Sequence, residues 1–101
     1  MVVFMYRNVI DIRKEVPSDV LKTLVVMADT AFNNRAGRVK NVSVSPYRFI
    51  YEGDEKDYGC LNLGMLSLYA KKDFVSNVLN WNWIDEDDPD ESCDVLKEMS
   101  I

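Results

Sequence analysis

Apolar residues recur at three- and four-residue spacing between residues 18 and 34, which is the period of an amphipathic α-helix. The apolar positions of this period are Val20, Leu21, Leu24, Ala28, Ala31 and Phe32. Ser18 is suited to cap the first turn by accepting a hydrogen bond from a backbone N–H, and Asp19 follows near the positive end of the helix dipole. Asn33, Asn34 and Gly37 are residues at which helices commonly end. The pattern predicts a helix over residues 18–34.

The first 13 residues carry two overlapping patterns. Phe4, Tyr6, Ile10 and Ile12 share the two-residue period of a strand, which Asn8 interrupts. The apolar residues of the same segment also fit a helical spacing. Because β-branched and aromatic residues are typical of strands, we favour a strand here.

Three further segments, residues 38–45, 47–52 and 58–66, show the alternation of β-strands. Their alternating apolar and aromatic residues are Val42 and Val44, then Tyr47, Phe49 and Tyr51, then Leu61, Leu63 and Met65. The connections are short, and the second of them, residues 53–57, is a charged turn. Short connections between strands predict an antiparallel meander.

Helical spacing returns at residues 70–80, where apolar residues recur every four positions from Ala70 to Val78. A last short helix is predicted over residues 89–99. Its start signals are the acidic cap Asp88, the proline Pro89 at the first helical position and Glu91 three residues after the cap. The residues that would dock this helix on the rest of the protein are Cys93, Val95, Leu96 and Met99.

Together these elements predict an α+β fold: an antiparallel sheet of three or four strands, packed by two helices, with a short C-terminal helix. The chain has 101 residues, which is the length of one ordinary domain. Within this single domain we expect a body, residues 1–84, on which residues 85–101 pack. Hydrophobic residues make up 48% of the chain, enough apolar material to offset the entropy lost on folding.

Charge is distributed unevenly along the chain, whose formal net charge is −5. Residues 85–101 contain eight acidic residues and one lysine, a net charge of −7. Residues 1–84 contain the other nine acidic residues (17 − 8) and eleven basic residues (12 − 1), a net charge of +2. Such an asymmetry between segments is typical of proteins that bind other molecules.

The composition argues against catalysis. The chain has no histidine, which is the usual proton shuttle near neutral pH and the commonest metal ligand. Glycine-rich phosphate-binding motifs and the nucleophile-elbow motif of hydrolases are absent from the sequence. We therefore expect a protein without enzymatic activity, catalytic residues or a cofactor.

Metal binding and a membrane location are not predicted either. Cys60 and Cys93 have no further ligand at zinc-site spacing, so we expect two reduced and inert thiols. The acidic stretches at residues 52–57 and 85–91 lack the spacing of a calcium loop. No apolar run approaches the roughly 18–20 residues of a membrane span, and no signal-peptide pattern is present. A cytoplasmic location without a membrane partner is the expectation.

The strongest candidate for a binding site is the acidic row of residues 85–91. Its acidic members are Asp85, Glu86, Asp87, Asp88, Asp90 and Glu91. Such a row can imitate the phosphates of a nucleic acid and compete for a basic groove on another protein. Trp81 and Trp83 directly precede the row, either as anchors at the centre of the interface or, the alternative that we favour, as core residues.

Our leading hypothesis is therefore a non-enzymatic interaction protein that blocks a basic surface of a larger protein. Small acidic inhibitors encoded by phages and mobile elements, and immunity proteins, act in this general way. A structural subunit that assembles through a sheet edge or an apolar patch is another hypothesis.

A second hypothesis is a nucleic-acid-binding module. Residues 30–51 contain no acidic residue, and their basic residues are Arg35, Arg38, Lys40 and Arg48. Tyr47, Phe49 and Tyr51 alternate in the same region, and basic sheets with exposed aromatic side chains hold RNA or single strands. We favour the inner face of the sheet for these three side chains. The net negative charge also opposes binding to a polyanion.

Overall fold

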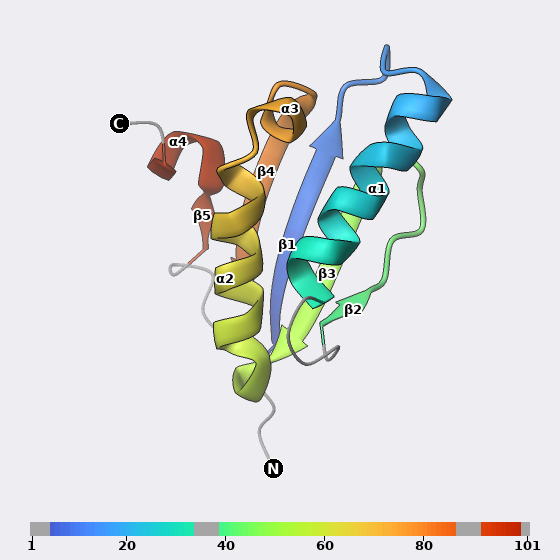
Figure 1. The fold of residues 1–101 in the computed structure, drawn as a ribbon. Coiled ribbons are helices and arrows are strands. Elements are labelled where there is room, and N and C mark those ends of the chain that lie inside the picture. Colours follow the sequence, from blue (N-terminus) through green and yellow to red (C-terminus); the bar gives the residue numbers. More distant parts are fainter. Residues whose placement is uncertain (1–4, 34–38, 87–91, 100–101) are drawn as a thin grey trace.

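Strand β1 (Met5–Ile12) forms the centre of an antiparallel sheet in a computed structural model that describes residues 5–33, 39–86 and 92–99 (Figure 1). The other strands of the described residues are β2 (Lys40–Asn41), β3 (Arg48–Asp54), β4 (Val78–Asp85) and β5 (Cys93–Asp94). Their order across the sheet is β2-β3-β1-β4-β5. The α+β class and the antiparallel sheet are confirmed, with five strands in the described part of the chain rather than three or four.

Helices α1 (Ser18–Asn33) and α2 (Tyr58–Tyr69) lie side by side on one face of the sheet (Figure 1). Helix α1 connects β1 to the β2-β3 pair, and the 3-10 helix η1 (Glu55–Asp57) with α2 connects β3 to β4. Since β1 lies between β3 and β4, each helical connection crosses over one strand, which is the split β-α-β arrangement. The helix predicted over residues 18–34 and the strand favoured near the start of the chain are both confirmed.

The segment predicted as a strand over residues 58–66 is instead helix α2, so the predicted meander is wrong. The alternation of Leu61, Leu63 and Met65 indicated a strand, but the buried positions of α2 are Leu61, Gly64, Met65 and Leu68. These positions have helical spacing. The alternation arises because apolar residues also occupy the outer side of this helix.

The helix predicted over residues 70–80 is also wrong. It is replaced by the short helix α3 (Lys72–Val75) and the first part of β4. Phe74 is fully buried in α3, and Val78 begins β4 with 3% exposure, so the four-residue spacing joined residues of two different elements. Trp81 and Trp83, expected after the end of a helix, lie within β4.

At both ends of the sheet, short pairings replace longer predicted elements. Of the strand predicted over residues 38–45, the described part forms only the two-residue β2, and Val44 is 92% exposed. The predicted C-terminal helix is shorter than residues 89–99: β5 pairs with β4, and α4 (Val95–Met99) follows it. The predicted helix start at Asp88, Pro89 and Glu91 lies outside the described residues. Val95 is 1% exposed and docks α4 on the core.

The core lies between the helices and the sheet, because alternate strand residues point toward α1 and α2. Phe49 and Tyr51 are 3% and 0% exposed, which confirms the inner face for these two aromatic side chains. Tyr47 is half-buried, and its hydroxyl donates a hydrogen bond to the carbonyl of Val16. No helix among the described residues is long and apolar enough to cross a bilayer.

Candidate protein-binding surface

The face of the sheet opposite α1 and α2 carries the polar alternate residues of the strands, and we call it the open face. The registers of β1 with β3 and β4 bring these residues into cross-strand rows. One row runs from Glu52 through Arg7 to Ile84, and the next contains Ile50, Val9 and Asn82. The open face therefore combines aliphatic side chains with charged ones.

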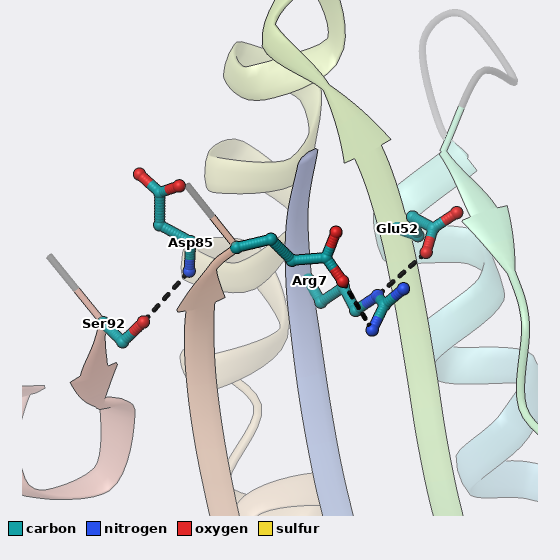
Figure 2. A network of polar contacts seen from close by, with 5 residues as sticks. Arg7, Glu52, Asp85 and Ser92 are labelled. Atoms are coloured by element: carbon teal, nitrogen blue, oxygen red, sulfur yellow. Dashed lines mark hydrogen bonds and ion pairs between the residues drawn. The ribbon is translucent and has the colours of Figure 1, made fainter. Parts of the chain in front are cut away.

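Arg7 joins two carboxylates at one end of the open face (Figure 2). Its Nε lies 2.8 Å from Oε2 of Glu52, and one of its terminal nitrogens lies 2.8 Å from Oε1 of Glu86. Both distances are those of charge-assisted hydrogen bonds. The side chains of Arg7, Glu52 and Glu86 are 40%, 18% and 38% exposed, so solvent reaches all three groups. One guanidinium thus pairs with a carboxylate of β3 and with the carboxylate that directly follows β4.

Two more acidic residues lie at this end of the sheet, because β3 and β4 both finish where β1 begins. Asp54 is opposite Met5, and Asp85 is opposite Tyr6. We call the set Glu52, Asp54, Asp85 and Glu86 the acidic surface. Arg7 pairs with two of these carboxylates, and the exposed Lys40 of β2 lies opposite Glu52. Four acidic side chains are thus gathered at one end of the sheet.

Backbone contacts fix the end of β4, from which two of these carboxylates project. The N–H of Glu86 donates to the carbonyl of Met5, at 3.2 Å. The N–H of Asp85 donates to the hydroxyl of Ser92, at 3.0 Å, which ties the segment before β5 to the end of β4. The Asp85 carboxylate points away from Arg7 (Figure 2). The two neighbouring acids thus present their carboxylates in different directions.

The structure locates only part of the acidic row predicted from the sequence. Asp85 and Glu86 lie at the end of the sheet, whereas Asp87, Asp88, Asp90 and Glu91 fall outside the described residues. Trp81 is fully buried and Trp83 is 7% exposed, so both belong to the core, the alternative favoured from the sequence. Neither indole presents an exposed surface on which a partner could be anchored.

The basic residues proposed for nucleic-acid binding are not brought together in the described part of the chain. Arg35 and Arg38 lie outside it. Lys40 is opposite Glu52, and Arg48 forms an ion pair with Asp11, with Nε 2.6 Å from the carboxylate. This hydrogen bond, and then the charge of Asp11, raises the pKa of Arg48 above its ordinary value. Lys40 and Arg48 therefore lie beside Glu52 and Asp11, respectively, on the same face of the sheet.

The end of the open face remote from the acidic surface contains a surface hollow of about 550 Å³. Its charged lining residues are Asp11, Arg13, Lys14, Glu15 and Arg48. Since both signs of charge line this hollow, it has no single electrostatic preference. Its exposed residue Glu15 is useful as a control, because it lies away from the acidic surface.

Two members of this site, Arg7 and Glu52, were not singled out from the sequence. Glu52 appeared there only at the end of a predicted strand and in an acidic stretch without calcium-loop spacing, and Arg7 lay in a segment of ambiguous pattern. Their contact joins residues 45 positions apart, so it depends on the pairing of β1 with β3. If the sequence had given the register of β1 with β3, it would have placed Arg7 opposite Glu52.

Among the described residues no cluster of three or more acidic or cysteine side chains is arranged to hold a metal ion. Comparisons of the chain with family models, with curated proteins and with solved structures found no match. The split β-α-β arrangement by itself does not indicate a function, so the argument rests on the surface.

Proposed function

We propose that this protein is a non-enzymatic binding protein whose acidic surface docks on a basic surface of a larger protein and blocks it. The observation that supports this most directly is the double ion pair of Arg7 with Glu52 and Glu86. This ion pair brings together a carboxylate of β3 and one that directly follows β4, next to the face of the sheet that no helix of the described residues covers. The partner is a larger protein with a basic surface, such as one that binds nucleic acid.

Carboxylates that are already restrained before the partner arrives favour binding, because less side-chain freedom is lost in the complex. A flexible acidic side chain loses rotamer freedom when it meets a partner, which costs about 0.5–1.5 kcal/mol per side chain. Glu52 and Glu86 are already restrained by Arg7. Acidic side chains held close together can imitate the phosphates of a nucleic acid, and they would steer a basic partner toward this end of the sheet. Inhibitors and immunity proteins of phage or mobile-element type are the class of protein that fits this behaviour.

The first experiment identifies the partner and compares the full chain with a variant in which two carboxylates of the acidic surface are neutralised. The full chain and the double variant Asp85→Asn/Glu86→Gln are immobilised separately, and the retained proteins are identified by mass spectrometry. A second double variant, Glu15→Gln/Asp73→Asn, changes the net charge equally at exposed positions outside the acidic surface. Substitution is preferable to truncation after Ile84, because truncation would also remove β5 and the buried Val95.

The affinity of the retained partner is then measured for all three chains at two salt concentrations. We expect Asp85→Asn/Glu86→Gln to weaken binding about tenfold or more, which corresponds to roughly 1.4 kcal/mol. The control variant should bind as the unmodified chain does. Added salt should weaken the complex, since exposed charges are screened over about 8–10 Å at physiological ionic strength. Equal affinities of the two double variants would contradict the proposal.

The nucleic-acid-binding alternative has less support, because Lys40 and Arg48 face Glu52 and Asp11. In addition, Phe49 and Tyr51 are buried and so offer no stacking surface. A gel-shift assay with mixed RNA and DNA at low salt tests this alternative. We expect no retardation by the full chain, and retardation that Lys40→Gln abolishes would favour the alternative instead.

A further inference from the structure

Helix α2 is unusual in this chain because it carries no charge. Residues 58–70 contain no acidic or basic side chain, although 29% of all residues are charged. A surface helix of a globular protein normally has a charged or polar outer face, whereas a helix that is apolar all round is normally buried. Yet Leu63 and Leu66 of α2 are 50% and 40% exposed. The outer side of α2 thus resembles an interior surface that nothing in the described structure covers.

The outer side of α2 has a defined pattern. Gly59, Leu63, Leu66 and Ala70 are all exposed and follow one another at spacings of four, three and four residues. This is the spacing of the seam in paired helices. The buried residues of α2 are Leu61, Gly64, Met65 and Leu68, on the opposite side of the helix. The outer stripe, as we call Gly59, Leu63, Leu66 and Ala70, is therefore separate from the stripe that packs on the core.

The outer stripe is symmetric about its midpoint, between residues 64 and 65. If two α2 helices pair antiparallel about this point, Leu63 of one helix faces Leu66 of the other, and Gly59 faces Ala70. The flanking polar residues match as well, since Asn62 faces Ser67. A two-fold symmetric interface requires such self-complementarity, because each residue i that meets residue j is matched by j meeting i.

We propose that a second copy of this chain covers α2, forming a two-fold symmetric dimer through antiparallel outer stripes. Charge favours a second copy over a charged partner. Two chains of net charge −5 repel each other, and α2 is a surface where they can meet without bringing like charges together. A partner selected by its charge gains nothing at this uncharged helix.

Gly59 supports close approach of the second helix. A Cβ atom added at Gly59 would meet nothing within 4 Å in the single chain, so internal packing does not require a glycine there. Alanine is also the better helix former, so helix propensity does not favour a glycine at this position. A partner helix passing over this position explains why a small residue occupies it, and Ala70 is the small residue that faces it.

The dimer is expected to be weak and to leave the acidic surface free. A 12-residue helix is about 18 Å long at about 1.5 Å per residue, so a contact through α2 alone is smaller than the about 800 Å² per partner of a standard interface. Helix α2 lies on the covered face of the sheet, whereas Arg7 and Glu52, which form the double ion pair with Glu86, lie on the open face. Self-association therefore does not compete with the proposed docking of a partner.

The test is sedimentation equilibrium of the full chain over a wide concentration range, with variants that probe the register. Leu63→Lys and Leu66→Glu are each expected to raise the dissociation constant about tenfold or more, because a charge would face a leucine. Leu79→Lys is the matched control, since Leu79 is 52% exposed and lies on β4 rather than α2. This control should dimerise as the unmodified chain does.

Mixing Leu63→Lys with Leu66→Glu gives the decisive result. In the antiparallel register the new lysine of one chain faces the new glutamate of the other, so the mixture should dimerise at concentrations at which each variant alone is mainly monomeric. Circular dichroism spectra show that the variants are folded. The proposal is overturned if the unmodified chain is monomeric at all concentrations, if Leu63→Lys dimerises unchanged, or if the mixture remains monomeric.

Discussion

The indole N–H of Trp81 donates a hydrogen bond to Oδ1 of Asn8, at 2.7 Å, and both side chains are fully buried. The two residues lie on the neighbouring strands β4 and β1, diagonally across the ladder from each other. This polar contact in the core explains why Asn8 interrupts the apolar alternation of β1. It also satisfies the only hydrogen-bonding group of the indole, so Trp81 can be buried completely.

Double-mutant analysis of this pair should show strong coupling. Trp81→Phe leaves Oδ1 of Asn8 without its donor and removes buried volume, so we expect a loss of about 2–4 kcal/mol in the free energy of unfolding. Asn8→Leu leaves the indole N–H unpaired and should destabilise by about 1–3 kcal/mol. The double variant should be about 1–2 kcal/mol more stable than the sum of the single effects predicts, because no unpaired group remains.

Urea unfolding of the four chains measures this coupling. A double variant whose loss equals the sum of the two single losses would show that the hydrogen bond contributes nothing specific. Asn8→Leu has a further effect that works in the opposite direction. Nδ2 of Asn8 is buried and has no hydrogen-bond partner in the described structure, and its removal relieves that desolvation. The single Asn8→Leu loss is therefore expected at the lower end of its range.

A second prediction concerns Tyr51, which is fully buried at the centre of β3. Its hydroxyl donates to Oδ1 of Asp29 at 2.5 Å, and the same carboxylate accepts from the side chain of Asn41 at 3.1 Å. Burial, then the hydrogen bond to Asp29 and its charge, raises the pKa of Tyr51 well above its ordinary value of 10.0. The folded protein thus keeps this proton at a pH where the unfolded chain releases it.

The sign of the pH effect follows from this difference in bound protons. Below about pH 10 both states hold the proton, and the stabilisation is fully present. Above that pH the unfolded chain binds fewer protons, so the free energy of unfolding falls as the pH rises, by up to about 1.4 kcal/mol per pH unit. Tyr51→Phe should remove this part of the slope. Urea midpoints of the two chains across the alkaline range measure it, and parallel slopes would contradict the prediction.

The sequence predicted the elements whose apolar pattern has a single period. Helix α1 was found within one residue of its end, because its stripe is flanked by polar residues and cap signals. Helix α2 was missed because apolar residues occupy both of its sides, so two-residue alternation and helical spacing fit equally well. Strand β4 was missed because the spacing from Ala70 to Val78 was given more weight than the alternation of Asn80, Trp81, Asn82 and Trp83.

The candidate site was predictable only where charge alone defined it. The sequence indicated Asp85 and Glu86 because they begin a run of acidic residues. It could not show that Arg7 pairs with both Glu86 and Glu52. That arrangement depends on β1 lying between β3 and β4. The sequence also predicted burial for Trp81, Trp83, Phe49 and Tyr51, since large aromatic residues are usually covered.

The thiol of Cys93 should react slowly with alkylating reagents in the folded protein. Partial burial, and then the negative charges of Glu98 and Asp94, raises the pKa of Cys93 above its ordinary value. Since the thiolate is the reactive form, a raised pKa lowers the rate at neutral pH. With Cys60→Ser as background, alkylation by iodoacetamide followed by mass spectrometry should be several-fold slower in the folded than in the urea-unfolded chain. Adding Glu98→Gln should increase the folded-state rate, and equal folded and unfolded rates would contradict the prediction.

The two glycines of α2 should respond oppositely to alanine. At Gly64 an added Cβ would lie 2.6 Å from Cδ1 of Phe32 and 3.0 Å from the carbonyl oxygen of Ala31, so α1 and α2 would have to move apart. Phe32 is 2% exposed and its ring stacks on Tyr51 with centroids 4.4 Å apart, so it has little room to yield. We expect Gly64→Ala to lower the free energy of unfolding by about 1–3 kcal/mol through overpacking.

Gly59→Ala is the matched variant in the same helix. Its added Cβ meets no atom within 4 Å, and alanine is the better helix former, so the free energy of unfolding should rise by up to about 1 kcal/mol. Both substitutions are measured by urea unfolding on the Leu63→Lys background, which removes any contribution from the proposed dimer. Because helix propensity favours alanine at both positions, only the close contact with Ala31 and Phe32 of α1 can reverse the sign at Gly64. A stabilising Gly64→Ala would therefore show that α1 and α2 are not packed as closely as the structure indicates.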